Sequence, residues 1–289
     1  MRKLTACIWV AALTLSACGT RNNTENDKDT RPQHEIIKPL NVTYMALPGD
    51  SAKKLVNTYT PQQQKIIMAV NRVDVSNLGA LDTVLIPNDL NGQVMQYLPF
   101  PQSVPYLEKV NKIVFFSYPT QTFAAYENGW LVYTGPTNMG REKDPTPTGL
   151  YYTNWKAEKT TSTFNDEWEL KWNFNIENKE GIGWHQYSLP GYPASHSCLR
   201  MLEDDAKYMY KWADEWKLKG TDDVLAKGTP VIVFGSYPFG GTKPWLQLLT
   251  NARALDITPE QIEQLTTPHL SEILKEQENT QQLKGEKSS

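Results

Sequence analysis

The chain has few cysteines and few histidines, with three and four of them in 289 residues. Their positions lack the CxxC or HExxH spacing that zinc sites use, and no glycine-rich phosphate loop is present. The formal net charge is −3, so there is no basic excess of the kind that binds nucleic acid. We therefore expect no metal, no cofactor and no nucleic-acid partner.

The first 18 residues have the pattern of an export signal. A positive start, Met1 to Lys3, precedes an uncharged stretch that is too short to span a bilayer as a permanent helix. The stretch ends in Leu15-Ser16-Ala17-Cys18, which resembles a bacterial lipobox. The resemblance implies cleavage after residue 17 and lipidation of Cys18. We expect a membrane-anchored lipoprotein of the bacterial cell envelope that faces the periplasm. The outer membrane is favoured because Gly19, not an aspartate, follows Cys18.

That processing would leave one free thiol, Cys198, because Cys7 would depart with the signal peptide. A lone thiol in an exported protein is a candidate reactive residue. His185 and His196 lie shortly before it, and an imidazole can remove the proton that makes a thiol into a nucleophilic thiolate. The composition alone leaves a second interpretation open, a buried cysteine beside two hydrogen-bonded core histidines.

Four stretches resemble, in the same order, motifs of the L,D-transpeptidase (YkuD) catalytic domain. The clearest is S-H-S-C-L-R at residues 195–200, where Ser197 takes the place of the family's glycine. The others are the strand I-G-W-H at 182–185, T-P-T-G-L-Y at 146–151, and a strand–Asn-Gly–strand opening followed by a glycine at 122–140. The resemblance covers roughly residues 110–236. It implies a mainly β fold, a YkuD-type β-sandwich with a helix after the nucleophile.

The resemblance also implies a chemistry, acyl transfer on peptidoglycan stem tetrapeptides through a thioester acyl-enzyme. Cys198 would be the nucleophile and His185 its base, and His196 would shape the pocket and assist proton transfer. The acceptor would be the amine of a second stem peptide or of a wall-anchored protein. We assign substrate binding to Arg200, Ser195, Ser197 and Tyr187.

Two other functions stay open. With water as acceptor, the same cysteine would make an L,D-carboxypeptidase or another hydrolase. Serine adopts glycine-like dihedrals only at a cost, so we expect a changed backbone at Ser197. The replacement of the family's glycine by Ser197 favours a third possibility, a catalytically decayed peptidoglycan-binding lipoprotein.

Before the catalytic domain, polar composition predicts a flexible tether at 18–40. Apolar spacing predicts a small α/β module at 41–90, with strands at 42–46 and 81–87 and helices at 51–57 and 61–71. Its later half resembles a LysM peptidoglycan-binding module; the alternative is a structural appendage. A proline-bearing linker would span 91–109.

Later in the chain, the charged, proline-bearing stretch 141–147 predicts a loop. We expect a helix at 202–217 and a strand at 228–234. An extension at 237–289 would be helical near 258–275 and disordered from 276.

Overall fold

A computed structural model describes residues 35–162 and 169–286. The predicted signal peptide, Cys18 and most of the predicted tether lie outside the described residues. The described residues from Ile36 onward form one compact unit. None of the helices in the described ranges combines the length and apolarity needed to cross a membrane.

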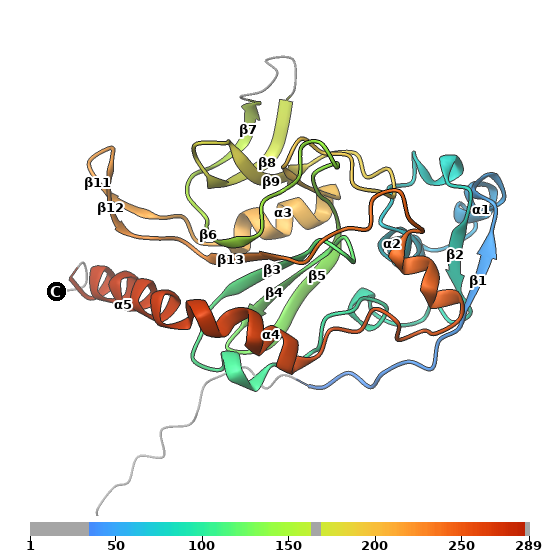
Figure 1. The fold of residues 1–289 in the computed structure, drawn as a ribbon, viewed down its shortest axis with the longest axis horizontal. Coiled ribbons are helices and arrows are strands. Elements are labelled where there is room, and N and C mark those ends of the chain that lie inside the picture. The colour runs from blue at the N-terminus through green and yellow to red at the C-terminus, as the bar shows by residue number, and fades with distance from the viewer. Residues whose placement is uncertain (1–34, 163–168, 287–289) are drawn as a thin grey trace, which may run out of the picture. The chain divides into compact units, whose positions relative to one another are not determined.

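Nine strands form the main sheet, and the predicted mainly β fold is confirmed. They run β6-β13-β3-β4-β5-β10-β9-β8-β7 across the sheet (Figure 1). Their bounds are β3 Ile113–Ser117, β4 Thr122–Glu127, β5 Trp130–Asn138, β6 Gly149–Tyr152, β7 Lys156–Thr161, β8 Glu169–Glu177, β9 Ile182–Gln186, β10 Leu199–Met201 and β13 Pro230–Phe234.

The sheet curls so that its two halves share one core. Phe116 of β3 and Trp184 of β9 have ring centroids 6.1 Å apart, although β4, β5 and β10 lie between their strands. Helix α3 (Glu203–Trp212) follows β10 and packs against β8 and β9 (Figure 1). Burial of these large aromatic side chains is the dominant favourable term in such a core.

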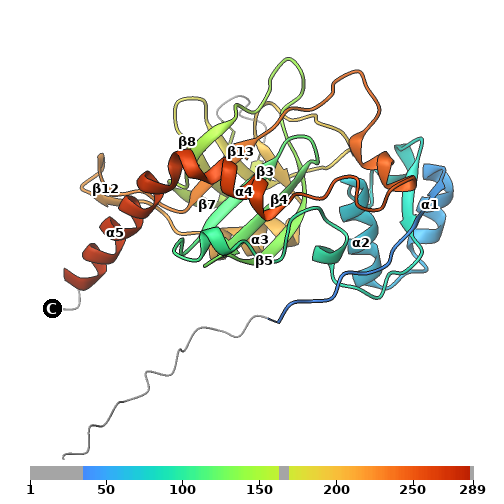
Figure 2. The same ribbon diagram turned by 60° about the horizontal axis from the view of Figure 1, so that its bottom comes forward.

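A second apolar layer covers the outer face of the sheet. Phe115 and Ile232 pack there with Ile262 and Ile273, which come from α4 (Pro259–Thr266) and α5 (Leu270–Glu286). Both helices run along the outside of the sheet (Figure 2). Because β3 is covered on both faces, all of its residues are buried and it has no polar alternation.

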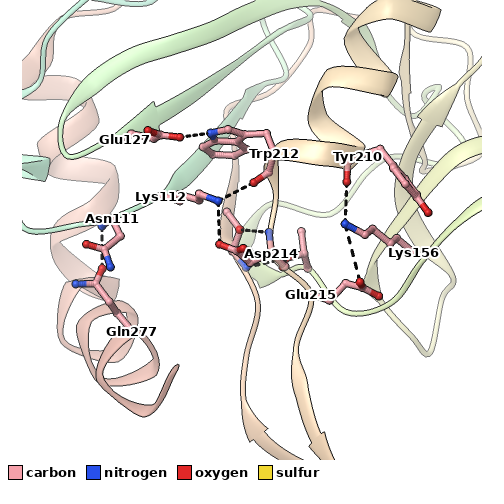
Figure 3. A network of polar contacts seen from close by, with 11 residues as sticks. Asn111, Lys112, Glu127, Lys156, Tyr210, Trp212, Asp214, Glu215 and Gln277 are labelled. Atoms are coloured by element: carbon pink, nitrogen blue, oxygen red, sulfur yellow. Dashed lines mark hydrogen bonds and ion pairs between the residues drawn. The ribbon is translucent and has the colours of Figure 1, made fainter. Parts of the chain in front are cut away.

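The disorder predicted from residue 276 is wrong as far as Glu286, where α5 ends. Ile273 is only 2% exposed and anchors the helix in the core. One turn later, the Gln277 side-chain oxygen accepts from the Asn111 amide at 2.8 Å (Figure 3). These partners are more than a hundred residues away in sequence, so the polar composition of the helix does not reveal them.

Helix α3 is also shorter than predicted, because it ends at Trp212 rather than near Lys217. Two lysines that are distant in sequence, one at the start of β7 and one directly before β3, meet its last carbonyls (Figure 3). The Lys156 ammonium donates to the Tyr210 carbonyl at 2.9 Å, and Lys112 donates to the Trp212 carbonyl at 2.7 Å. Cations at a helix C-terminus satisfy carbonyls that lack intrahelical partners and complement the dipole. The chain then forms an unpredicted hairpin of β11 (Lys217–Lys219) and β12 (Asp223–Ala226).

The N-terminal part has the predicted order of elements. These are β1 (Tyr44–Leu47), α1 (Gly49–Val56), α2 (Pro61–Asn71) and β2 (Val84–Pro87), with β1 and β2 antiparallel. Trp245 and Leu248, from the 3₁₀ segment Pro244–Leu249, join the core of this module. The C-terminal extension therefore contributes to the module. Sugar binding by residues 41–90 stays a prediction. The other 3₁₀ segments are Leu78–Ala80, Val94–Gln96, Pro105–Leu107 and Thr267–His269.

Candidate active site

Cys198 lies directly before β10, beside the start of β9. Its thiol is 3.9 Å from the Gly181 carbonyl oxygen, to which it donates, and it also accepts from the Gly183 amide. The parallel register pairs Leu199 with Trp184, so Cys198 falls opposite Gly183. The fold thus holds the thiol against the strand that carries His185.

The predicted catalytic residues converge on one pocket. β10 and β9 are parallel, with Arg200 opposite His185. Because side chains alternate between the two faces of a sheet, Cys198, Arg200 and His185 project from the same face. The pocket is lined by Ser162, Leu170, His185, Tyr187, Ser195, His196, Cys198 and Arg200. Of the predicted catalytic and substrate-binding residues, only Ser197 does not line it.

The ring of His185 is buried and has a defined tautomer. It is 4% exposed, and its Nδ1 lies 3.0 Å from the Gln186 carbonyl oxygen. Only a protonated Nδ1 can donate to that carbonyl, so Nε2 carries the lone pair. Burial lowers the pKa of His185 to about 4. The imidazole is therefore neutral at neutral pH, with Nε2 available to accept a proton.

The thiol of Cys198 is also neutral at rest. Burial raises its pKa, against opposing effects of the Gly183 amide and the nearby Arg200 guanidinium, which favour the thiolate. Arg200 stacks on the Tyr187 ring, 4.5 Å from its centroid, and donates to the Ser188 carbonyl at 3.5 Å. The site is a thiol and an imidazole, both uncharged, beside one fixed cation.

A second cluster contains His196 and two residues that the sequence analysis placed in a plain loop. The His196 Nδ1 lies 3.1 Å from Arg141 Nη2 and 3.4 Å from Asp144 Oδ2. Arg141 Nε donates to the same carboxylate oxygen at 2.5 Å and lowers the pKa of Asp144. Both residues directly precede the T-P-T-G-L-Y motif at 146–151, the only local signal that could have found them.

The hydroxyls of both predicted substrate-binding serines bond to the backbone. Ser195 is 1% exposed, and its Oγ donates to the Cys198 carbonyl at 2.5 Å. The Ser197 hydroxyl donates toward the Pro145 carbonyl at 3.1 Å. Thr146 Oγ1 donates to the Ser197 carbonyl at 2.8 Å. These bonds hold the turn that presents Cys198.

Ser197 adopts the backbone region that favours glycine. Its φ is +73°, which L-residues with a Cβ adopt only at a cost. The turn immediately before Cys198 is therefore left-handed although a serine occupies it.

Nothing in the described ranges suggests a metal centre. Residues 35–162 and 169–286 contain no group of three or more His, Cys, Asp or Glu side chains placed to hold a metal ion.

Residues 111–233 match the family model described as YkuD, the L,D-transpeptidase catalytic domain. The match is to the YkuD catalytic domain and covers less than half of the 289 residues. The matched part contains the complete pocket around Cys198 and His185.

Solved structures give weaker similarities. An L,D-transpeptidase from Mycobacterium tuberculosis H37Rv is 22% identical, with 43% of this chain and 58% of that chain covered and a TM-score of 0.35. One from Stackebrandtia nassauensis is 22% identical, with 44% and 57% covered and a TM-score of 0.36. The Mycobacterium smegmatis L,D-transpeptidase is 20% identical, with 43% and 59% covered and a TM-score of 0.35. The match thus spans less than two thirds of each of these structures, and none of the curated proteins matches the chain.

Proposed function

We propose that the protein is a cysteine-dependent L,D-transpeptidase that acts on peptidoglycan stem tetrapeptides. The observation that carries the proposal is the placement of Cys198, directly before β10, and His185 of the adjacent parallel β9 on one face, lining one pocket within the part that matches the YkuD family model. A nucleophile and a base need this proximity for proton transfer to accompany attack.

In the first step, His185 Nε2 takes the proton of the Cys198 thiol, and the sulfur attacks the carbonyl carbon before the terminal D-alanine. The C–N bond breaks, and the departing amine takes the proton back from His185. A thioester remains on Cys198. Because both partners begin neutral, charge separates only when the substrate is in place.

In the second step, an acceptor amine loses a proton to His185 and attacks the thioester carbonyl. A new amide forms, and the Cys198 thiolate leaves and regains the proton. We propose a second stem peptide or a wall-anchored protein as the source of the amine. Water in its place gives hydrolysis.

The tetrahedral intermediate in each step carries an oxyanion. The amides of Ser197 and Cys198 are the proposed donors, and the left-handed φ of Ser197 supports this role because alternating backbone conformations turn successive N–H groups toward one point. A donor of this kind is worth about 3 kcal/mol in the transition state. Arg200 and Tyr187 line the pocket and are proposed to bind the substrate.

Cys18 is proposed to carry a lipid that anchors the protein to a membrane of the cell envelope, with the outer membrane favoured. The motif Leu15 to Cys18 supports this location.

The test incubates protein that lacks residues 1–18 with purified disaccharide-tetrapeptide and follows muropeptides and intact protein by mass spectrometry. We expect a cross-linked dimer with loss of D-alanine, absent in Cys198→Ala and strongly reduced in His185→Gln. Tripeptide without dimer would identify a hydrolase. No product and no adduct on Cys198 would refute the enzymatic proposal and favour a binding lipoprotein.

A further inference from the structure

The loop that joins His185 to Cys198 rests on the N-terminal module. The loop comprises residues 187–194, and its Leu189 is completely buried. Val73 forms an antiparallel bridge with Pro190, and the Asp74 amide donates to the Leu189 carbonyl at 3.0 Å. A short β-like pairing therefore connects the end of α2 with the active-site loop.

The contact continues through a close approach at Gly191. Its φ is +80°, and an added Cβ would lie 2.8 Å from the Leu81 side chain. Glycine is the residue that permits this turn without strain or collision. The loop is thus packed tightly on residues that precede the YkuD match at 111–233.

The carboxylate of Asp74 is the centre of the contact. Its Oδ2 accepts from the Leu189 amide at 2.8 Å and from the Ser188 hydroxyl at 3.1 Å. Asn77 strengthens the same point, because its Nδ2 donates to the Ser188 hydroxyl at 2.7 Å and to Asp74 Oδ2 at 3.0 Å. Burial raises the pKa of Asp74, but hydrogen bonds from Ser76, Leu189 and Asn77 outweigh it and hold the pKa below its usual range. Asp74 is ionised at neutral pH, and charge-assisted hydrogen bonds are the stronger kind.

One residue that Asp74 holds, Ser188, contacts a residue of the pocket. The Ser188 carbonyl accepts from Arg200, whose charge favours the thiolate of Cys198. Two positions earlier, the Gln186 carbonyl accepts from His185 Nδ1 and orients the ring. A shift of Ser188 therefore moves the partner of Arg200 and strains the partner of His185.

We propose that Asp74 is a positioning residue for the Cys198 site. Its carboxylate fixes Ser188 and Leu189, and these in turn set the placement of Arg200 and His185. The N-terminal module thereby completes the geometry of a pocket whose lining residues all come from later in the chain. The role of the site toward substrate rests on the proposed transpeptidase function. The placement of the Cys198 thiol and of Arg200 does not depend on that function.

The test uses the full-length protein in detergent and measures Cys198 alkylation by iodoacetamide across pH, read on the Cys198 peptide by mass spectrometry. We expect Asp74→Ala to raise the pH at which the thiol becomes reactive and to slow alkylation at neutral pH by about tenfold. The reason is that the Ser188 carbonyl, the hydrogen-bond partner of Arg200, is no longer held in place. Asp74→Asn keeps one acceptor oxygen and should recover part of the rate. Asp50→Asn is the matched control, because Asp50 is an exposed carboxylate on α1 of the same module.

Lower stability alone would change the melting temperature and leave the alkylation profile of the folded protein unchanged. An unchanged profile in folded Asp74→Ala would therefore overturn the proposal. If that variant does not fold, Ser188→Ala decides, because Ser188 is exposed and its hydroxyl donates to Asp74. We expect the same direction of change there, and no change would equally overturn the proposal. Alkylation needs no peptidoglycan, so a protein without transpeptidase activity would still give a clear result.

Discussion

The buried imidazole of His185 should make the stability of the protein depend on pH in a way that one substitution removes. Burial holds the pKa of His185 at about 4 in the folded protein, against an ordinary value of 6.5. The folded state thus resists a proton that the unfolded chain accepts. Stability from the neutral ring is fully present above the unfolded pKa and is lost as pH falls from there toward the folded pKa.

The size of the effect follows from the two pKa values. The separation between 6.5 and about 4 corresponds to about 3 kcal/mol at acidic pH. The ring is only 4% exposed, so solvent screening reduces this little. A loss of about 3 kcal/mol is a large part of the stability of an ordinary domain.

The assay is urea unfolding at neutral pH and at about pH 4, followed by the fluorescence of the nine tryptophans. The comparison is between wild type and His185→Gln. Carboxyl groups also titrate in this range, but both proteins contain them, so their contribution to the loss of stability cancels in the difference. We expect wild type to lose about 3 kcal/mol more than the variant on acidification. Equal losses in wild type and His185→Gln would refute the assignment of a buried neutral ring.

Three further predictions concern single side chains. Burial raises the pKa of Asp205 to about 7, and its Oδ2 has no hydrogen-bond partner. The protonated carboxyl group therefore stabilises the folded protein, and this stability is lost as pH rises through 7. We expect Asp205→Asn to stabilise the protein by up to about 4 kcal/mol at alkaline pH and hardly at all at acidic pH. Urea unfolding at both pH values checks this. Ser197→Gly should be more stable than Ser197→Ala by about 1 kcal/mol, since both lose the hydroxyl and only alanine keeps the left-handed strain; equal midpoints in thermal unfolding would contradict this. Arg200→Gln should raise the pKa of the Cys198 thiol and slow its alkylation at neutral pH by roughly three- to tenfold; an unchanged rate would remove Arg200 from the electrostatics of the site.

The sequence by itself determined several of the strands and the candidate catalytic residues. The strand–Asn-Gly–strand pattern at 122–140 predicted β4 and β5, and helical spacing predicted α2 at its observed bounds. The runs around Cys198 and His185 identified the nucleophile and its base as candidates, and the structure places both in one pocket. Each of these conclusions depends on residues close together in the chain, where local pattern carries the information.

Tertiary structure alone decided the features that depend on distant partners. Helix α3 ends where Lys112 and Lys156 reach its last carbonyls, and no local pattern places lysines from such distant positions there. Helix α5 continues through polar sequence because Ile273 is anchored in a core built by the sheet.

At the site, the same reasoning explains what the sequence missed. From the sequence, Arg141 and Asp144 are charged residues in a loop. In the folded protein, the turn before Cys198 places His196 in contact with both of them. Asp74 is more than a hundred residues from Leu189, and its carboxylate holds the active-site loop only because the folded chain brings the two together. Hydrogen bonds and burial act on neighbours in space, and the sequence lists only neighbours in the chain.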